Sequence, residues 1–342
     1  MEENMMKQDK KILSIRDLVV EYRTTEERVE AVNGVSFDLN YGETIGLVGE
    51  TGAGKTTIAR AIMGILPDPP ARVRSGSIRL DDTELLGLEN EKMMHIRGNR
   101  ISMVFQDPMT ALNPVIRVGR QIAEGIRIHE KLSWKEAEKK AMEIFEMVGI
   151  PASRFREYPH QFSGGMKQRV VIAIALACNP DLLIADEPTT ALDVTIQAQV
   201  LEMIRDLQKK KNSAMILITH DFGVVAKTCD KVATIYGGQI IEYGTKRQIF
   251  HDCRHPYTMG LFEAIPSMTG DVERLNPIVG QPPDPTHLPA GCYFSPRCPY
   301  ATDACRSGPI PMFRLKDGHE CRCLKYEDEA VSRTEAVKLE DD

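Results

Sequence analysis

Strand-like and helix-like patterns alternate along the first 250 residues. Short apolar, partly β-branched runs are typical of strands buried on both faces. They cover residues 44–48, 101–105, 182–186 and 214–219. Apolar positions with helical spacing occupy residues 58–63, 170–177 and 194–210. Strands that alternate with helices in this way indicate an α/β fold.

Other segments add to this core. Residues 12–22 and 31–39 have strand-like patterns, and we expect them to form an antiparallel ribbon near any nucleotide site. Residues 117–149 are largely helical, so we expect an inserted helical subdomain. In residues 232–243 two strand patterns flank Gly237-Gly238, a two-residue hairpin turn that we expect to complete the sheet.

The composition indicates a globular protein of two domains, or of one large domain with an appendage. The chain has 342 residues, of which 42% are hydrophobic, enough for a proper core. A formal net charge of -6 argues against non-specific nucleic-acid binding as the main role. Residues 1–11 lack the apolar core of a signal peptide, and no later apolar run is long enough to cross a bilayer. We therefore expect that the polypeptide does not itself cross a membrane.

A glycine-rich loop between the first apolar strand and its helix is the clearest chemical signal. It consists of Gly49, Glu50, Thr51, Gly52, Ala53, Gly54, Lys55 and Thr56, with Thr57 behind it. Glycines let the backbone approach a polyphosphate and direct N–H groups at it, and the helix presents its positive N-terminal end. Lys55 would reach the β- and γ-phosphates, and the Thr56 hydroxyl would bind Mg²⁺. The alternative is a glycine-rich turn that binds nothing, but the complete pattern in this context favours a phosphate loop.

Two acids, Asp186 and Glu187, follow the apolar run that begins at residue 182. They would lie at the sheet edge, where a bound Mg²⁺ belongs. Asp186 can hold the metal through its water shell, and Glu187 can accept a proton from the attacking water. The alternative is a strand that happens to end in two acids before a turn at Pro188. The phosphate loop upstream favours the catalytic interpretation.

Three more polar residues lie at the ends of predicted strands. Gln106 stands where a ligand-sensing residue belongs, or it is a loop glutamine that faces water. His220 can donate a hydrogen bond to a γ-phosphate, or it forms a helix-capping pair with Asp221. Tyr22 can stack on a purine ring, or it is a half-buried strand tyrosine.

A second helix N-terminus is available for an anion. Ser163 occupies an N-cap position, and Gly164 and Gly165 leave the helix end unobstructed. Taken alone, this motif is equally well explained as a well-capped helix.

The order and spacing of these motifs resemble the ATP-binding subunit of an ABC (ATP-binding cassette) transporter over about residues 12–250. Residues 49–56 resemble the Walker A loop, residues 182–186 the Walker B strand and Gln106 the Q-loop. Glu187 matches the catalytic glutamate, His220 the switch histidine, Tyr22 the adenine-stacking aromatic, Asp193 the D-loop residue, and Ser163, Gly164, Gly165, Met166 and Gln168 the signature motif. Phe162 and Met166 depart mildly from the family pattern, which more often has leucine and glutamine there.

This resemblance implies a P-loop NTPase of the ABC cassette type. The fold would have a RecA-like α/β core, an antiparallel β subdomain and an inserted helical subdomain at about residues 107–178. ATP would contact residues 49–57 together with Tyr22 and Gln106, and hydrolysis would depend on Lys55, Glu187 and His220. The Mg²⁺ ligands would be Thr56, Gln106 and Asp186.

The resemblance also implies partners. In the family, each ATP lies between the Walker A loop of one subunit and the signature motif of another, and this chain has one of each. It would therefore pair with a second ABC ATPase subunit, which we expect to be a similar non-identical chain, and with two transmembrane permease subunits. An extracytoplasmic substrate-binding protein would act indirectly, and no nucleic acid is expected. The chain would work as a peripheral protein at the cytoplasmic face of a prokaryotic cell membrane.

Cysteines cluster near the C-terminus. They are Cys292, Cys298, Cys305, Cys321 and Cys323. Four thiolates from this set can enclose an iron–sulfur cluster or hold zinc, and two disulfides are a third possibility. A chain with a nucleotide site and no export signal belongs in a reducing compartment, which ranks disulfides lowest.

This tail resembles the C-terminal extension of oligopeptide and dipeptide importer ATPases, in which a His-Pro-Tyr motif precedes cysteines that hold a [4Fe-4S] cluster. His255-Pro256-Tyr257 matches the motif. The resemblance implies the ligands Cys292, Cys298, Cys305 and Cys323, with Cys321 as a spare and Zn²⁺ as the alternative metal. We expect a small cysteine-rich C-terminal domain at residues 251–330, with residues 1–11 and 331–342 flexible.

The sequence thus favours the ATP-hydrolysing subunit of a peptide importer. Related importers of nickel chelates or oligosaccharides share this tail, so their cargoes are the first alternative. A different class is a soluble ABC ATPase that acts on DNA or ribosomes, which would usually need tandem cassettes or a coiled-coil insertion. In a third class, the cysteine region acts as a redox sensor that regulates the ATPase.

Overall fold

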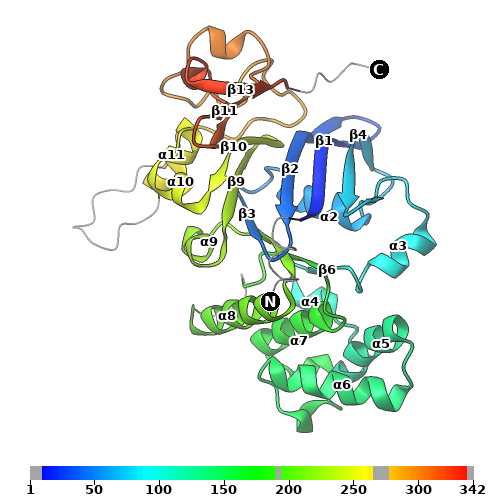
Figure 1. Ribbon diagram of the computed structural model, residues 1–342. Coiled ribbons are helices and arrows are strands. Elements are labelled where there is room, and N and C mark those ends of the chain that lie inside the picture. The colour runs from blue at the N-terminus through cyan, green and yellow to red at the C-terminus, as the bar shows by residue number, and fades with distance from the viewer. Residues whose placement is uncertain (1–9, 190–193, 265–276, 337–342) are drawn as a thin grey trace. The chain divides into compact units, whose positions relative to one another are not determined.

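The computed structural model describes residues 10–189, 194–264 and 277–336 (Figure 1). The chain divides into two compact units. The first unit joins residues 1–13, 39–44 and 79–219, and the second joins residues 14–38, 45–78 and 220–342. In the described part of the chain, no helix is long and apolar enough to cross a membrane.

The first unit contains a parallel sheet and a helical insertion. Its parallel strands are β6 (Ile101–Val104), β7 (Leu182–Asp186) and β8 (Ala214–Ile218), with β7 between the other two. Every residue of these three strands is buried, as their apolar sequences predict. Its helices are α3 (Asn90–Ile96), α4 (Pro108–Ala111), α5 (Val118–Glu130), α6 (Trp134–Met147), α7 (Gly164–Leu176) and α8 (Val194–Lys211).

The helical insertion packs around aromatic side chains. Helices α5 and α6 lie side by side (Figure 1). The Phe145 ring of α6 makes edge contacts with Phe155 and Phe162, at centroid distances of 5.8 and 6.3 Å. Helix α7 begins at Gly164, earlier than the apolar pattern predicts, because the Ser163 hydroxyl caps it by accepting from the N–H of Met166. The predicted N-cap role of Ser163 is thereby confirmed.

The second unit carries the remaining strands and helices. The strands β1 (Lys11–Arg23), β2 (Arg28–Asn40) and β4 (Ala71–Leu80), most of whose residues belong to this unit, have the order β2-β1-β4. The short strand β5 (Thr83–Glu84) belongs to the first unit and pairs with Arg79 and Leu80 at the end of β4. A second set contains β3 (Thr44–Val48), β9 (Lys231–Tyr236), β10 (Gln239–Thr245), β11 (Met312–Leu315), β12 (Glu320–Cys321) and β13 (Ala330–Thr334). The helices are α2 (Lys55–Met63), α9 (Phe222–Thr228), α10 (Lys246–His251) and α11 (Pro256–Glu263).

The sequence predicted that the hairpin of β9 and β10 would complete the sheet, but the sheet continues beyond it. Strand β12 pairs with β10, placing Cys321 opposite Glu242, and β11 and β13 continue outward in the order β13-β11-β12-β10-β9-β3 (Figure 1). The small domain expected at residues 251–330, called the C-terminal segment below, is therefore not separate, because its strand β12 shares backbone hydrogen bonds with β10 of the cassette sheet. Strand residues also lie inside both ranges that we expected to be flexible, since β1 begins at Lys11 and β13 extends to Thr334, and residues 1–9 and 337–342 lie outside the described residues.

A buried aromatic cluster joins these elements within the second unit. Tyr236 of β9, Tyr257 of α11 and Phe294 contact one another, with ring centroids 4.5 to 5.4 Å apart. Phe294 belongs to residues 292–323, which contain the five clustered cysteines and are called the cysteine segment below. All three side chains are almost fully buried, and Ile241 of β10 completes the cluster. The packing of apolar rings from three separate chain segments fixes the C-terminal segment against β9 and β10.

Candidate functional site

The glycine-rich loop connects β3 to α2 in the second unit. Gly49, Gly52 and Gly54 have φ angles of 149°, 82° and 100°, which L-residues with a side chain rarely adopt. A Cβ on Gly49 would lie 2.2 Å from the carbonyl oxygen of Ile235, and one on Gly54 would lie 2.3 Å from that of Ala31. Both the backbone conformation and the close approach therefore require glycine at these two positions.

Lys55 lies across this loop. Its Nζ donates hydrogen bonds to the carbonyl oxygens of Gly49 (2.7 Å) and Glu50 (2.9 Å), and the residue is only 7% exposed. Helix α2 starts behind Gly54 without a side-chain cap on its first turn. Its terminal N–H groups and the ammonium group thus provide donors and positive charge for an anion.

Tyr22 lies next to the start of α2. Its Oη is 3.3 Å from Oγ1 of Thr57, and the residue is half-buried at the end of β1. The stacking of Tyr22 on adenine stays a prediction.

The first unit brings Gln106 and Glu187 into direct contact. Nε2 of Gln106 donates to Oε2 of Glu187 over 2.8 Å, because β6 and β7 are adjacent and parallel and each residue follows the end of its strand. Glu187 has a φ angle of 46°, and its N–H donates to the carbonyl oxygen of Ile218. Holding a residue with a side chain at such a positive φ angle costs about 1 to 3 kcal/mol of conformational free energy, and such strain concentrates at functional sites. Asp186, one residue earlier, is buried.

The signature residues are anchored to the same unit. Gln168 is buried on α7, and its Nε2 donates to the carbonyl oxygen of Pro188 over 2.6 Å. Because Pro188 directly follows Glu187, this bond joins the signature helix to the segment that carries the predicted base. Arg154 approaches Met166, with Nη1 2.9 Å from Sδ. Asp193, the predicted D-loop residue, lies outside the described residues.

Of the two functions considered for the His220–Asp221 pair, the structure assigns capping to Asp221. Its carboxylate accepts from the N–H groups of Gly223 (2.8 Å) and Val224 (3.2 Å) at the start of α9. His220 belongs to the second unit and is exposed. Its role toward a γ-phosphate stays a prediction.

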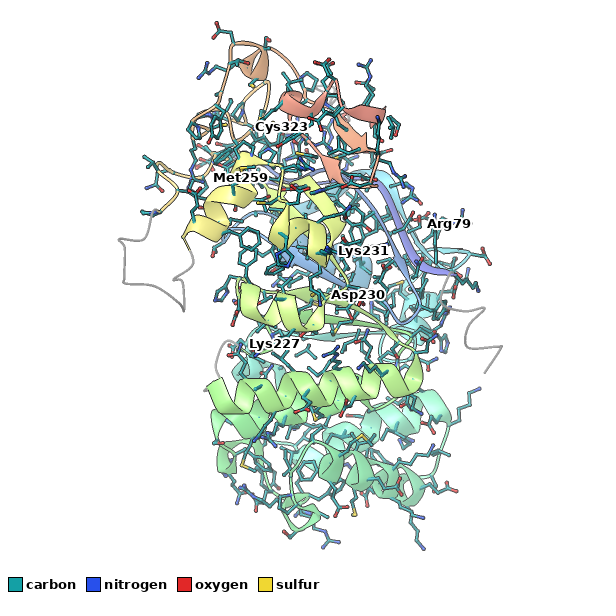
Figure 2. The ribbon with its side chains drawn as sticks, turned by 60° about the vertical axis from the view of Figure 1, so that its left-hand side comes forward. Arg79, Lys227, Asp230, Lys231, Met259 and Cys323 are labelled. Atoms are coloured by element: carbon teal, nitrogen blue, oxygen red, sulfur yellow. The ribbon has the colours of Figure 1, made fainter. Side chains whose placement is uncertain are left out.

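Four of the five clustered cysteines line one cavity in the second unit. Cys292, Cys298, Cys305 and Cys323 lie around a space of about 420 Å³. Figure 2 shows Cys323 at the C-terminal strands. Cys321 does not line this cavity, because it lies on β12, fully buried, between Glu242 of β10 and Phe313 of β11.

The cavity is an unfavourable place for thiolates without a cation. Burial, with a smaller contribution from the neighbouring cysteines, raises the pKa of Cys292 to about 11. The pKa values of Cys298 and Cys323 are also raised, first by burial and then by other cysteines. Among the described residues, no group of three or more His, Cys, Asp or Glu is arranged to hold a metal ion.

The sequence motifs do not reveal a buried acid–histidine group around Glu242. Glu242 and His319 are fully buried, with Nε2 of His319 2.9 Å from Oε1 of Glu242. The Glu242 carboxylate also accepts from the backbone N–H groups of Arg254 and His255, the latter over 3.1 Å. Burial lowers the pKa of His255 to about 4, so that imidazole is neutral. The sign of this group in the sequence is Glu242 itself, a single glutamate between the apolar residues Ile241 and Tyr243 of a predicted strand.

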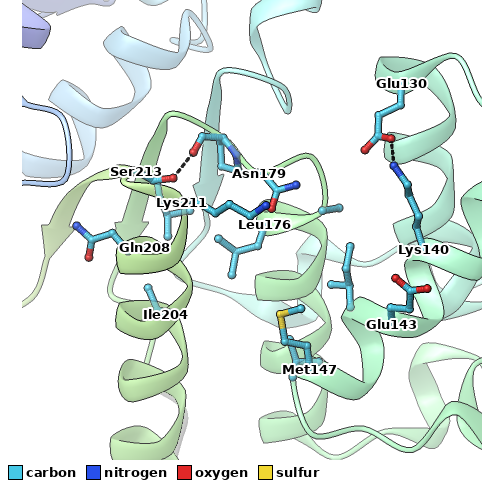
Figure 3. Close-up of a pocket in the computed structure, with 15 residues that line it drawn as sticks. Glu130, Lys140, Glu143, Met147, Leu176, Asn179, Ile204, Gln208, Lys211 and Ser213 are labelled. Carbon is cyan, nitrogen blue, oxygen red and sulfur yellow. Dashed lines mark hydrogen bonds and ion pairs between the residues drawn. The ribbon is translucent and has the colours of Figure 1, made fainter. Parts of the chain in front are cut away.

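A separate pocket of about 280 Å³ lies in the first unit between α6, α7 and α8 (Figure 3). Ile144, Leu176 and Ile204 provide apolar walls, and an ion pair between Glu130 and Lys140 lies among the lining residues. Its lining contains none of the residues that the sequence associates with ATP. We therefore assign this pocket no catalytic role.

Comparison with known proteins identifies the family. The family described as "ABC transporter" matches residues 32–190, and "Oligopeptide/dipeptide transporter, C-terminal region" matches residues 241–305. The chain belongs to the ABC transporter family, among the ATP-binding proteins of oligopeptide and dipeptide transport. This confirms the resemblance inferred from the motifs.

The similarity to individual relatives extends over nearly the whole chain. The chain is 48% identical to the oligopeptide transport ATP-binding protein OppD of Bacillus subtilis, over 96% of this chain and 93% of the relative. Identity to the dipeptide transport ATP-binding protein DppD of the same organism is also 48%, over 94% and 96% of the two chains. The dimeric bacterial ABC transporter cassette MJ0796 has a TM-score of 0.63 at 25% identity, over 69% of this chain and 99% of that one. This solved cassette confirms the predicted cassette fold.

Proposed function

We propose that this chain is the ATP-hydrolysing subunit that powers import of di- or oligopeptides through an ABC transporter. The cassette alone does not specify a cargo, because it is common to ABC proteins. The observation that carries the peptide assignment is the match of residues 241–305 to the C-terminal region of oligopeptide and dipeptide transporters. The relatives named for oligopeptide and dipeptide transport are similar to this chain over 96% and 94% of its length, which includes that region.

The described residues fit the chemistry of phosphoryl transfer to water. Lys55 would hold the β- and γ-phosphates, and His220 would donate to the γ-phosphate. Glu187 would accept a proton from the attacking water, and the contact with Gln106 orients its carboxylate. No covalent intermediate is expected, because positioning and electrostatics suffice for this reaction.

The predicted Mg²⁺ ligands have the right donor chemistry. Thr56, Gln106 and Asp186 supply hydroxyl, amide and carboxylate oxygens, which Mg²⁺ prefers. When bound, the ion would neutralise charge on the β- and γ-phosphates.

The partners follow from the motif count. The chain has one phosphate loop and one signature motif, so a second cassette must supply the signature that covers its ATP. Two permease subunits would provide the pathway, and the chain would act as a peripheral protein at the cytoplasmic membrane face.

Reconstitution of the transporter tests this function. Tagged chain purified from membranes should recover two permeases and a second cassette, and the complex in vesicles should take up labelled peptides only with ATP. Uptake of nickel chelates or oligosaccharides in place of peptides would overturn the cargo assignment. Recovery of ribosomes or DNA would overturn the transporter assignment itself.

We also propose that the cysteine cavity holds a [4Fe-4S] cluster ligated by Cys292, Cys298, Cys305 and Cys323. The cavity supports this choice because all four side chains line it and Cys321 does not. Four cysteine ligands are the usual set for such a cluster. Burial favours the protonated thiol of Cys292, and the positive iron ions would stabilise the thiolate form. The zinc alternative uses the same thiols.

Two cysteine variants separate the ligand from the spare. We expect anaerobically purified protein to be brown and to contain about four iron atoms per chain. Cys323→Ser should lose most of the iron, whereas Cys321→Ser should retain it. Iron analysis and visible absorption provide the measurement. Colourless protein that contains zinc and no iron would rule out the cluster, and iron loss confined to Cys321→Ser would reverse the ligand assignment.

A further inference from the structure

One arginine of the cysteine segment contacts the phosphate loop within the second unit. Both terminal nitrogens of Arg297 bind the Glu50 carboxylate, with Nη1 2.7 Å from Oε2 and Nη2 3.1 Å from Oε1. The side chain of Arg297 is 5% exposed and that of Glu50 is 27% exposed. A two-point arginine–carboxylate contact of this kind is both strong and directional.

Further contacts fix the guanidinium group in place. Nη1 also donates to Oη of Tyr236 over 3.1 Å, and Nε donates to the carbonyl oxygen of Val279 over 3.1 Å. The carboxylate and hydroxyl partners hold the pKa of Arg297 above its usual value, so the group is charged. The guanidinium group of Arg297 is therefore held rigidly between Glu50 and Tyr236 of β9.

The backbone of Glu50 is held by a second residue that follows β10 in the chain, Tyr257 of α11. The N–H of Glu50 donates to Oη of Tyr257 over 2.9 Å, and Tyr257 is fully buried in the aromatic cluster. Burial raises the pKa of Tyr257, which keeps its hydroxyl protonated at neutral pH. The C-terminal segment thus restrains both the main chain and the side chain of one phosphate-loop residue.

We propose that Arg297 is a positioning residue for the phosphate loop, which acts by holding Glu50 in the conformation that binds nucleotide. This rests on the proposed role of the loop in ATP binding. Glu50 lies directly next to Gly49, and Lys55 Nζ bonds to the carbonyls of both residues. The loop's three glycines at positive φ would otherwise give it many conformations, so restraint at Glu50 lowers the entropy lost on binding.

A purely structural role for Arg297 is the competing explanation. In that case the pair with Glu50 would stabilise the C-terminal segment on the sheet and nothing more. The two explanations differ in one measurable quantity, because only a positioning role changes nucleotide affinity in protein that remains folded.

The test compares four variants of the full chain by equilibrium binding of a fluorescent ATP analogue with Mg²⁺ and by thermal unfolding without nucleotide. We expect Arg297→Gln to weaken binding about tenfold, equivalent to about 1.4 kcal/mol, and Arg297→Lys to weaken it less. Glu50→Gln, nearly isosteric in a partly exposed loop, should fold and show a similar loss. The double variant should bind no more weakly than the worse single variant, because one interaction is removed in all three.

Two controls make the outcomes distinct. Arg314→Gln removes another arginine of the C-terminal segment, which is 61% exposed and 4.0 Å from Glu320, and it should leave affinity unchanged. Lys55→Ala should abolish binding, and normal binding by that variant would contradict the proposed role of the loop. If Lys55→Ala fails to bind while Arg297→Gln and Glu50→Gln bind like wild type, the positioning role alone is overturned. In the assembled transporter, the positioning role predicts a raised KM for ATP with little change in kcat.

Discussion

Replacement of Glu187 by glutamine should lower ATP turnover by about 10²- to 10⁴-fold while ATP binding is retained. The amide has the shape of the carboxylate but cannot accept a proton from water. Its oxygen can still accept the hydrogen bond from Gln106 Nε2, and the backbone at a φ angle of 46° is equally accessible to glutamine. The variant therefore removes the proton acceptor without removing the local structure.

The measurement is the rate of phosphate release by the assembled transporter, together with the Kd for ATP. Asp181→Asn is a suitable control, because Asp181 is also a carboxylate of the first unit, paired with Arg100 over 2.7 Å just before β7. That variant should retain turnover. Unchanged turnover in Glu187→Gln would show that another group accepts the proton.

Replacement of Glu242 by leucine should destabilise the protein by about 3 to 5 kcal/mol, because each buried hydrogen-bond donor that loses its acceptor costs about 1 to 3 kcal/mol. The variant leaves the N–H groups of Arg254 and His255 without their acceptor, in a fully buried place. It also leaves the His319 ring without the carboxylate 2.9 Å away. Each unpaired buried donor adds to the loss.

Urea unfolding followed by circular dichroism measures this effect. Glu320→Leu is the matched control, because Glu320 lies on the paired strand β12 but is half-buried, with its nearest cationic group 4.0 Å away on an exposed arginine. Loss of such a partly exposed, long-range ion pair usually shifts stability by less than about 1 kcal/mol. Equal midpoints for the two variants would mean that the Glu242 group contributes nothing to stability.

Local motifs were predictable from the sequence, and distant pairings were not. The phosphate loop, the strands β6 to β8 and the Ser163 cap depend on neighbouring residues, so their spacing identifies them. The contact of Gln106 with Glu187 spans 81 positions, and it follows once the two strands are known to be parallel neighbours. The contact of Arg297 with Glu50 spans 247 positions, and nothing in either local sequence specifies it.

The C-terminal strands were missed for a different reason. Strands β11 and β12 contain four and two residues, too short for an alternating pattern to be recognised. The proline-rich residues 280–285 indicate an extended connector, and no alternating pattern predicts a strand after them. Their formation depends on the partner edge of β10, which supplies the hydrogen bonds that so short a strand cannot provide alone.

The pairing of β12 with β10 also limits how this chain can be shortened. A fragment that ends after residue 250 would match the length of a minimal cassette, yet it would leave β10 as an uncovered edge strand with a row of unsatisfied backbone groups. The same cut would expose the apolar faces of Tyr236 and Ile241 to water. Such a fragment would be prone to self-association, so the C-terminal segment serves this cassette as the cover that keeps its sheet from joining another.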